Sequence, residues 1–505
     1  VEKWAEQIIY YSRNKNILLQ KEQIIKARWH NILWSDTARQ LVNEIEKAIL
    51  PKIKLREAEK YSSNTNDMNL HSNEPTIWFD LTTSFLNWGG GITGIIRAEL
   101  SYARYLYQLN KDIHFFAIHY DERTQKSYFF EVTHDCLEWL FNELDLSSAY
   151  RNFRAFWDDL ELNKGIFRNP FLGNETFETN PKFIGAFNNA IIISVGVDIL
   201  FGDGVRSILV KLGEFRAQGN LSHSVVVQLI YDFTPTLYAH LHVETACWNF
   251  EHFLKATHDN ANMIIYGGQT AMRDGRDYEA EFNLKPKPST YIEFGSDIDS
   301  TMVGDENTSH KILTNLNLVK EKYILTVGTI EPRKNHEMLY KAYQIKYLEG
   351  KLDEMPTLVI AGKQGWKVAD FVETIKNDNR FINKIMLITP SDLELDVLYK
   401  NCAFTVLPTF YEGWSLTLPE SLSHHKFCLA AEVDPLKEIG KSMIAYMNPL
   451  HTQEWSDKIL FYFNNPKLVS EFEDKIKTSW HPKTWFESAQ DLKNMLFAFY
   501  KEVEE

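Results

Sequence analysis

The feature that most constrains this chain is an alternation of short apolar runs and helical stretches between about residues 320 and 450. The apolar runs are rich in β-branched residues and recur at Tyr323–Val327, Thr357–Ile360, Ile385–Ile388, Phe404–Leu407 and Phe427–Ala430. Helical stretches separate them, and Ser391 and Glu394 form the capping-box signature that opens one of these helices. Because parallel strands require a long crossover, usually a helix, this alternation predicts a doubly wound parallel sheet.

An earlier series of apolar runs predicts a second sheet of the same kind. Its strands are expected at Ile77–Thr82, Ile113–Ile118, Ala190–Ile193, Ser224–Ile230 and Asn262–Ile265. Residues 120–185 show no clear period and are interpreted as an aromatic-rich insertion. The length of 505 residues agrees with more than one domain, since domains usually span about 100–200 residues. Two Rossmann-like α/β domains would leave a cleft between them, where a ligand is expected.

The chain divides into six segments by pattern. We expect an N-terminal helical extension, a polar linker, a first Rossmann-like domain, a polar hinge, a second Rossmann-like domain and a C-terminal helix that returns to the first domain. Their bounds are residues 1–61, 62–75, 76–300, 301–320, 321–475 and 476–505. The helical extension is compatible with packing on the enzyme, pairing with another chain or lying on a membrane.

Charge and cysteine usage restrict the function classes. The formal net charge of −14 argues against a nucleic-acid-binding surface, because phosphate backbones require clustered Lys and Arg. The four cysteines form no C-x-x-C pair and are interpreted as reduced core thiols, which fits the cytoplasm. No apolar run reaches the roughly 18–20 residues that span a bilayer. We therefore expect a cytoplasmic protein, either free or peripheral at the inner face of the cell membrane.

Two adjacent cations follow the first strand of the second series. Arg333 and Lys334 lie between that strand and a helix, at the carboxyl end of the expected sheet. Ligands of open α/β sheets bind at this edge, and a cation pair beside a helix N-terminus suits a diphosphate. The alternative is an exposed basic turn that pairs with surface acids.

Two glutamates follow the Phe404–Leu407 strand, eight positions apart. Glu412 falls on the loop, from which a carboxylate can reach sugar hydroxyls, and Glu420 falls in the helix that starts near Leu416, where a carboxylate can hold a ribose diol. The amides between them can meet phosphate oxygens at the helix N-terminus. The alternative is that both are ordinary solvated acids.

Taken in order, these segments resemble glycosyltransferase family 4, which comprises retaining enzymes of the GT-B fold. The resemblance covers about residues 320–450 and rests on VGTIEPRKNH, IAGKQGW and PSDLELDVLYKNCAFTVLPTFYEGWSLTLPE. It implies that Arg333 and Lys334 neutralise the donor diphosphate, that Glu412 contacts the transferred sugar and that Glu420 binds the ribose. The other donor-binding positions it implies in this region are Gly328, Lys363, Ile388, Gly413, Trp414, Ser415 and Leu416.

The first domain resembles the family more thinly. Gly90 and Gly91 belong to a glycine-rich loop that would let the donor or acceptor approach the backbone; the alternative is a tight strand-to-helix turn. Asp232 would orient the acceptor hydroxyl or help accept its proton, and the alternative is an Asx-type turn before Pro235. Arg97 would face either the cleft or a surface acid.

The chain also departs from the family pattern. The usual Gly-Phe-Gly-Leu after the first glutamate is Gly413-Trp414-Ser415-Leu416 here, and His425 or Lys426 replaces a later glycine. These changes leave the acceptor chemistry and the donor identity open. Neither a DxD pair placed for a metal-dependent transferase nor an HExxH motif is found, so no metal and no cofactor beyond the nucleotide-sugar substrate is expected.

The resemblance implies a metal-independent, retaining transfer of a hexose from a nucleoside-diphosphate sugar. The acceptor would be a glycan, a lipid-linked glycan or a protein, in surface polysaccharide synthesis. Association with a membrane or with a partner glycosyltransferase is compatible with the helical extension. Two alternatives remain at this point: a glycoside phosphorylase, and a catalytically silent GT-B module that binds a glycan or a partner.

Overall fold

The described part of the chain lies within one of two units. The computed structural model describes residues 75–87, 94–110, 112–121, 126–132, 137, 187–197, 208–217, 219, 221, 223–297 and 306–504. The chain divides into units 1–74 and 75–505, and every described residue belongs to the second. The expected helical extension 1–61 therefore lies outside the described residues, as does the linker up to residue 74.

Among the described residues, the first sheet has seven strands, and six of them are parallel. The strands are β1 Thr76–Asp80, β2 Ile113–Asp121, β3 Lys126–Val132, β4 Ala190–Ser194, β5 Val225–Ile230, β6 Met263–Gly267 and β7 Ser289–Ile292. They lie in the order β3-β2-β1-β4-β5-β6-β7, and only β3 runs antiparallel to its neighbour. The predicted parallel sheet is confirmed, although the edge strands β3 and β7 were not predicted and β1 ends two residues early.

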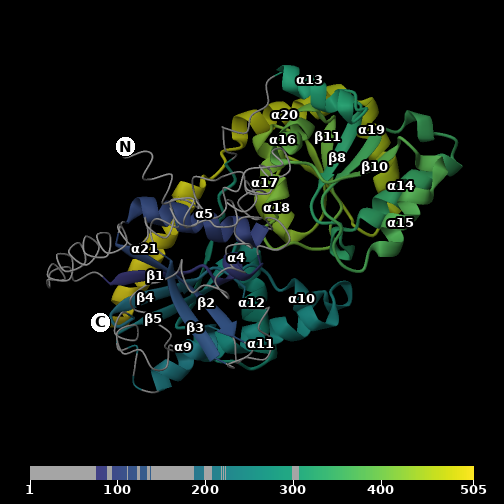
Figure 1. The fold of residues 1–505 in the computed structure, drawn as a ribbon. Coiled ribbons are helices and arrows are strands. Elements are labelled where there is room, and N and C mark those ends of the chain that lie inside the picture. The colour runs from purple at the N-terminus through teal and green to yellow at the C-terminus, as the bar shows by residue number, and fades with distance from the viewer. Residues whose placement is uncertain are drawn as a thin grey trace, which may run out of the picture. The chain divides into compact units, whose positions relative to one another are not determined.

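Helices cover both faces of this sheet (Figure 1). They are α4 Thr82–Asn87, α5 Gly94–Leu109, α9 Ile208–Ala217, α10 Thr234–Leu237, the 3-10 turn η3 Ala239–Leu241, α11 Glu244–Asn260 and α12 Gln269–Glu281. Successive side chains of a strand point to opposite faces. Ile77 and Phe79 accordingly join the core beneath α5, whereas Trp78 joins the core beneath α9 and α11.

The second sheet has six strands, all of them parallel. They are β8 Tyr323–Val327, β9 Thr357–Ala361, β10 Ile385–Ile388, β11 Phe404–Leu407, β12 Cys428–Ala431 and β13 Ala445–Met447. Their order, β10-β9-β8-β11-β12-β13, is that of a doubly wound Rossmann sheet. All five predicted strands are confirmed within one residue at either end, and the edge strand β13 was not predicted.

Helices and short turns connect these strands and complete the second domain. They are α13 Glu306–Asn315, η5 Pro332–Lys334, α14 His336–Leu348, η6 Leu352–Glu354, α15 Ala369–Asn377, η7 Asn379–Phe381, α16 Asp392–Asn401, α17 Thr417–Ser423, α18 Asp434–Gly440, α19 Thr452–Asn464 and α20 Pro466–Ser479. The predicted capping box of α16 is confirmed, since Ser391 and Glu394 bond each other's backbone amides. Helix α13 lies in the segment expected as a hinge, and its Leu313 packs in a core with Tyr323 of β8.

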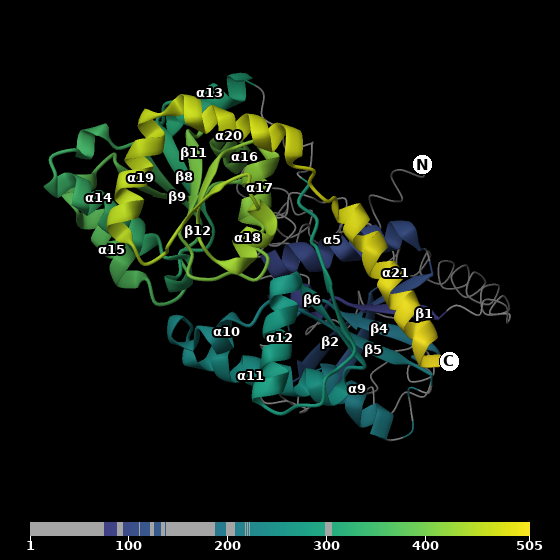
Figure 2. The same ribbon diagram turned by 180° about the vertical axis from the view of Figure 1, so that it is seen from behind.

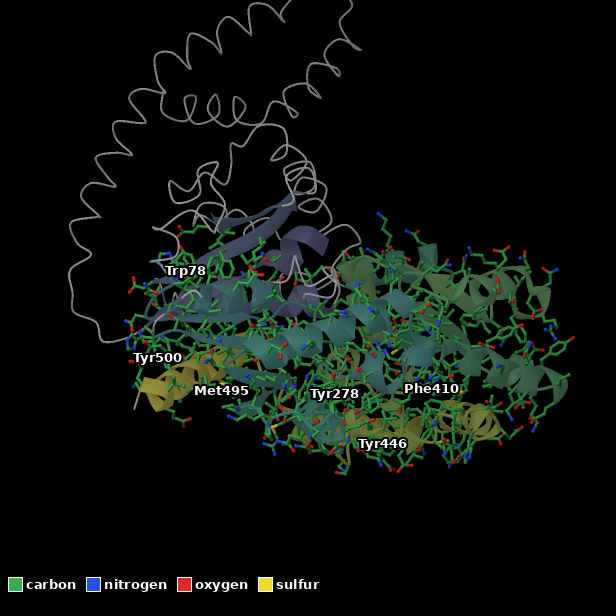
Figure 3. All side chains as sticks on the ribbon, turned by 90° about the horizontal axis from the view of Figure 1, so that it is seen from below. Trp78, Tyr278, Phe410, Tyr446, Met495 and Tyr500 are labelled. Carbon is green, nitrogen blue, oxygen red and sulfur yellow. The ribbon has the colours of Figure 1, made fainter. Side chains whose placement is uncertain are left out.

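The last helix, α21 Trp485–Glu504, packs along α5 of the first domain (Figure 2). Trp485 is buried in the first domain's core. The Ser488 hydroxyl lies 2.8 Å from the Tyr102 hydroxyl, and Tyr500, labelled in Figure 3, donates to Asn189 Oδ1 at 2.5 Å. The chain thus crosses from the second domain back to the first between α20 and α21.

Two further features bear on the earlier expectations. Cys402 and Cys428 are buried thiols, whereas Cys247 is only partly buried and Cys136 lies outside the described residues. None of the described helices is both long enough and apolar enough to cross a bilayer.

Candidate functional site

The candidate groups of the second domain lie where its sheet reverses chain order, between β8 and β11. Arg333 and Lys334 follow β8, and Glu412 follows β11. Such a switch point is where open α/β sheets bind ligands, because the loops leave the two strands in opposite directions. The loops are tied together, since the Phe410 amide donates to the Arg333 carbonyl at 2.9 Å.

Both cations converge on one carboxylate. Arg333 Nη1 donates to Glu412 Oε2 at 2.8 Å, and Lys334 Nζ donates to Glu412 Oε1 at 2.7 Å. Arg333 also donates to the Tyr411 carbonyl at 2.7 Å and to Glu331 Oε1 at 2.6 Å. The side chains of Arg333 and Lys334 are each only 14% exposed, which excludes the exposed basic turn.

The cation pair controls the charge of Glu412. Burial alone would raise the pKa of this carboxyl, but the charges of Arg333 and Lys334 lower the pKa to about 2. Burial raises the pKa of Glu331, against the opposing charge of Arg333. Glu412 is therefore ionised at neutral pH, and the sequence analysis missed Glu331 because nothing in its position marks it as a partner of Arg333.

Two glycines, Gly328 and Gly362, allow close approaches at the ends of β8 and β9. Gly328 has a φ of +139°, and a Cβ built on it would lie 3.4 Å from Lys334 Cε. A Cβ on Gly362 would lie 1.9 Å from the Gly328 carbonyl oxygen, so β8 and β9 can end side by side only with glycine there.

Lys363 and Ile388 lie at the ends of the next two strands, β9 and β10. The exposed Lys363 offers its carbonyl to the Ile330 amide at 2.8 Å, and the Ile388 carbonyl accepts from the Gly362 amide at 2.8 Å. Both residues therefore share the carboxyl edge of the sheet with Arg333, further along it from the β8–β11 switch point.

Glu420 is held by both domains. Arg97 Nη1 of α5 donates to Glu420 Oε1 at 2.6 Å, and the Tyr399 hydroxyl of α16 donates to Glu420 Oε2 at 3.0 Å. Of the two alternatives for Arg97, the cleft and a surface acid, the structure favours the first, since its partner is Glu420, the second glutamate of the candidate site. Tyr399 is a contact that the sequence analysis did not identify.

The loops of the two domains meet at Gly413 and Asp232. A Cβ on Gly413 would lie 2.7 Å from the Tyr231 carbonyl oxygen and 2.8 Å from Asp232 Cβ. Asp232 Oδ1 accepts from the Thr234 amide at 2.8 Å and from its hydroxyl at 2.6 Å, which is the Asx-type turn. Asp232 Oδ2 would lie 3.0 Å from the Gly413 Cβ, so the same side chain reaches the second domain's site.

The residues after Gly413 serve packing and backbone geometry. Trp414 packs against the cores of both domains and lies edge-to-face on Phe294, with ring centroids 6.2 Å apart. Ser415 has a φ of +63°, a left-handed conformation that glycine adopts more readily. Leu416 precedes α17 and packs on the first domain's core. The serine thus keeps a glycine-like backbone at one of the positions that depart from the family pattern.

A histidine of the first domain joins the site without any signal in the sequence. His242 is 7% exposed, its ring stacks on Trp366 with centroids 5.5 Å apart, and its Nε2 has no hydrogen-bond partner among the described residues. Burial and then the charge of Arg333 lower the pKa of His242, against the opposing charge of Asp232. Gly90 and Gly91 lie outside the described residues.

Comparison with known proteins finds similarity to glycosyltransferases over part of the chain. Residues 310–478 match the family model described as glycosyl transferases group 1. A serotype-specific mannosyltransferase WbdA of Escherichia coli is 24% identical over 249 residues, which are 48% of this chain and 29% of that protein. The O-antigen chain mannosyltransferase B of Escherichia coli is 30% identical over 130 residues, which are 25% of this chain and 33% of that protein. The chain thus spans about a third of the length of the curated relatives it matches.

Solved structures confirm the GT-B fold. Anabaena Alr3699/HepE, in complex with UDP and glucose, aligns with a TM-score of 0.55 and 12% identity over 84% of this chain and 99% of that one. Sucrose-phosphate synthase from Thermosynechococcus elongatus aligns with a TM-score of 0.52 and 14% identity over 85% of this chain and 100% of that one. At such identities the likeness shows the fold, while the sequence matches support a glycosyltransferase.

Proposed function

We propose that this protein is a retaining glycosyltransferase that moves a hexose from a nucleoside-diphosphate sugar to a glycan, a lipid-linked glycan or a protein. The observation that carries the proposal is the convergence of Arg333 and Lys334 on Glu412 at the switch point of the second sheet. Two largely buried cations beside a strand end suit the diphosphate of a sugar donor. The group 1 match over residues 310–478 includes all three residues.

The cations would act on the leaving group. As the bond between the sugar's anomeric carbon and the diphosphate oxygen breaks, negative charge grows on the diphosphate. Arg333 and Lys334 stabilise that charge, and groups placed where charge develops give the largest catalytic effects. The acceptor oxygen forms its bond to the anomeric carbon on the same face, and the departing diphosphate takes the acceptor's proton.

Glu412 has a different role in this scheme. A carboxyl with a pKa of about 2 holds a proton poorly at neutral pH, so Glu412 is unsuited to be the general base. Its ionised oxygens can instead accept hydrogen bonds from hydroxyls of the transferred sugar. Asp232 would orient the acceptor hydroxyl, because its side chain lies against Gly413, the residue next to Glu412.

The names of the matched relatives suggest the sugar and the setting. Both Escherichia coli relatives are mannosyltransferases, and one acts on an O-antigen chain. We therefore propose mannose as the transferred hexose and surface polysaccharide as the product, with synthesis in the cytoplasm or at the inner face of the membrane. The nucleotide is left to experiment, since a diphosphate site alone does not select a base.

We also propose that the transfer needs no metal ion, because Arg333 and Lys334 supply the positive charge that a metal would give the diphosphate. Turnover should be unchanged by a chelator such as EDTA. A loss of turnover that added Mg²⁺ or Mn²⁺ restores would contradict this part of the proposal.

The test is nucleotide release by the purified protein with GDP-, UDP-, dTDP- and ADP-sugars, GDP-mannose first. Release from one donor, abolished in Glu420→Ala, is expected. Because such enzymes release little without an acceptor, calorimetric binding of GDP, UDP, dTDP and ADP accompanies it. Binding without release would call for an acceptor screen. Release that depends on inorganic phosphate would favour a phosphorylase, and binding of none of the four would favour a silent module.

A further inference from the structure

The carboxylate of Glu420 has one donor from each domain. Arg97 Nη1 lies 2.6 Å from Oε1, and the Tyr399 hydroxyl lies 3.0 Å from Oε2. An ionised carboxylate offers about four lone-pair sites, so two donors leave room for two hydroxyls. The carboxylate is therefore oriented from two directions while it can still accept the hydroxyls of a ribose.

The two donors differ in how firmly they are held. The Tyr399 side chain is buried, and its ring stacks on His424 with centroids 4.7 Å apart and planes 14° from parallel. Arg97 is 41% exposed, whereas Glu420 is 15% exposed. Tyr399 is thus a fixed support within the second domain, and Arg97 is a more accessible partner supplied by the first.

The position of Arg97 follows from a close approach of α5 to the second domain. A Cβ on Gly94, the first residue of α5, would lie 3.4 Å from Leu416 Cδ1. Leu416 precedes α17, the helix that carries Glu420. Arg97 lies one turn into α5 and therefore reaches Glu420. Among the described residues, no hydrogen bond or ion pair joins Arg97 to Arg333 or Lys334.

We infer that Arg97 is a positioning residue for the nucleotide ribose, acting through Glu420. This inference rests on the proposed function, in which Glu420 binds the ribose diol. Arg97 holds the Glu420 carboxylate in one orientation before the nucleotide binds. Less side-chain entropy is therefore lost when the ribose binds. Its charge also offsets that of Glu420, which otherwise would repel the nearby diphosphate.

A second cross-domain ion pair provides a matched control. Arg273 Nη1 of α12 lies 2.7 Å from Asp434 Oδ2 at the start of α18, and both side chains are about half exposed at 52% and 53%. Asp434→Asn removes this pair and leaves Arg273 its contact with Asp274. A general effect of weakening domain contacts should therefore be reproduced by Asp434→Asn.

The experiment measures how strongly the site distinguishes ribose from deoxyribose. Calorimetry measures the affinity for UDP, GDP and ADP against their 2′-deoxy forms, and for dTDP against its ribose counterpart. The four proteins are the wild type, Arg97→Ala, Arg97→Lys and Asp434→Asn. We expect the wild type to prefer ribose about tenfold, as for a hydrogen bond to a charged group. The preference should fall to about twofold or less in Arg97→Ala, recover in part in Arg97→Lys and stay unchanged in Asp434→Asn.

The outcomes separate this inference from the function on which it rests. A purely structural role for Arg97 would weaken ribose and deoxyribose nucleotides equally, leaving the ratio unchanged, and that result would overturn the inference alone. A wild type that binds nucleotides without preferring ribose would also overturn the inference about Arg97 alone. A wild type that binds none of the nucleotides would overturn the proposed function as well.

Discussion

The carboxyl edges of the two sheets share a topology and differ in charge. Each has a switch point, between β1 and β4 in the first sheet and between β8 and β11 in the second, and each places buried carboxyl groups there. In the first, Asp80 accepts from the Thr82 amide at 2.9 Å and from Ser194 Oγ at 2.8 Å. Glu99 accepts from the Ser84 amide at 2.6 Å. In the second, Arg333 and Lys334 bond Glu412.

The partners decide the charge of each carboxyl. Burial raises the pKa of Asp80, and burial together with the charge of Asp80 raises the pKa of Glu99 well above its ordinary value. Arg333 and Lys334 instead lower the pKa of Glu412 to about 2, although burial opposes them. Among the described residues no Lys or Arg pairs with Asp80 or Glu99. Within the described residues, a cation pair therefore stands beside the carboxyl groups at one of the two edges and not at the other, which shows why function is argued from the site.

The largest expected effect is the loss of a cation at the second edge. Lys334→Ala should lower the rate of sugar transfer by about a hundredfold or more, as for removal of a preorganised charge-stabilising donor. Steady-state turnover with the identified donor measures it. Lys477→Ala, which removes an exposed pair with Asp474 in the same domain, is the control and should leave turnover unchanged. Normal turnover in Lys334→Ala would contradict the role of Lys334 in stabilising the leaving diphosphate.

The next effect contrasts Glu412 with Glu99 by the pH dependence of the stability that each contributes. Glu412 has a lowered pKa, so its contribution to stability is present above the ordinary Glu pKa and is lost as the pH falls towards about 2. Glu412→Gln should therefore lower the stability at pH 7 by about 3 kcal/mol, with a smaller difference near pH 3. Melting temperatures across this pH range measure it.

Glu99 should behave in the opposite sense. Its pKa is raised, so the stability it contributes is present at low pH and is lost as the pH rises above the ordinary Glu range. Glu99→Gln should match the wild type near pH 4 and melt at a higher temperature than the wild type near pH 8. Parallel pH profiles for Glu99→Gln and Glu412→Gln would contradict the contrast between the two edges.

A smaller effect is expected where the two edges meet. Gly413→Ala would place a Cβ 2.7 Å from the Tyr231 carbonyl oxygen and 2.8 Å from Asp232 Cβ, and both atoms belong to a loop held by its own turn. We expect turnover to fall about tenfold, as for a small displacement of reacting groups. Nucleotide affinity should change less. An unchanged rate would show that the loops separate during catalysis.

The smallest effect concerns the backbone. Ser415→Gly should leave turnover within about twofold and change stability by less than about 1 kcal/mol, because relief of the left-handed conformation opposes the added entropy of an unfolded glycine. Ser415→Val should be the more damaging change, since a β-branched residue resists a φ of +63°. Equal effects of the two substitutions would assign the serine a role through its hydroxyl.

The accuracy of the sequence prediction differs between central and edge strands. Central strands such as β5 are buried throughout and read as continuous apolar runs, so they were predicted. The edge strands β7 and β13 are short and only partly buried, which leaves no such run to detect. The antiparallel β3 belongs to the stretch interpreted as an insertion, where no periodicity marked a strand.

Two residues at departures from the family pattern have a left-handed backbone conformation. Ser415 stands where the family pattern has glycine and has a φ of 63°, and His425, one of the two candidates for replacing a later glycine, has a φ of 56°. Glycine adopts this conformation more readily than serine or histidine, so both residues hold a backbone that glycine would favour. The changed residue types left the acceptor chemistry and the donor identity open, and the structure adds that both residues lie in the left-handed region at a modest conformational cost.

By itself, the sequence determined the two α/β units, the positions of most of their strands along the chain and the residue types at the second carboxyl edge. Local apolar periodicity encodes these features, because each element must bury its own apolar face. Only the tertiary structure decided that Lys334 meets Glu412 across 78 positions of the chain and that Arg97 meets Glu420 across 323. Such pairs depend on strand order and on the packing of two domains, which no local pattern carries.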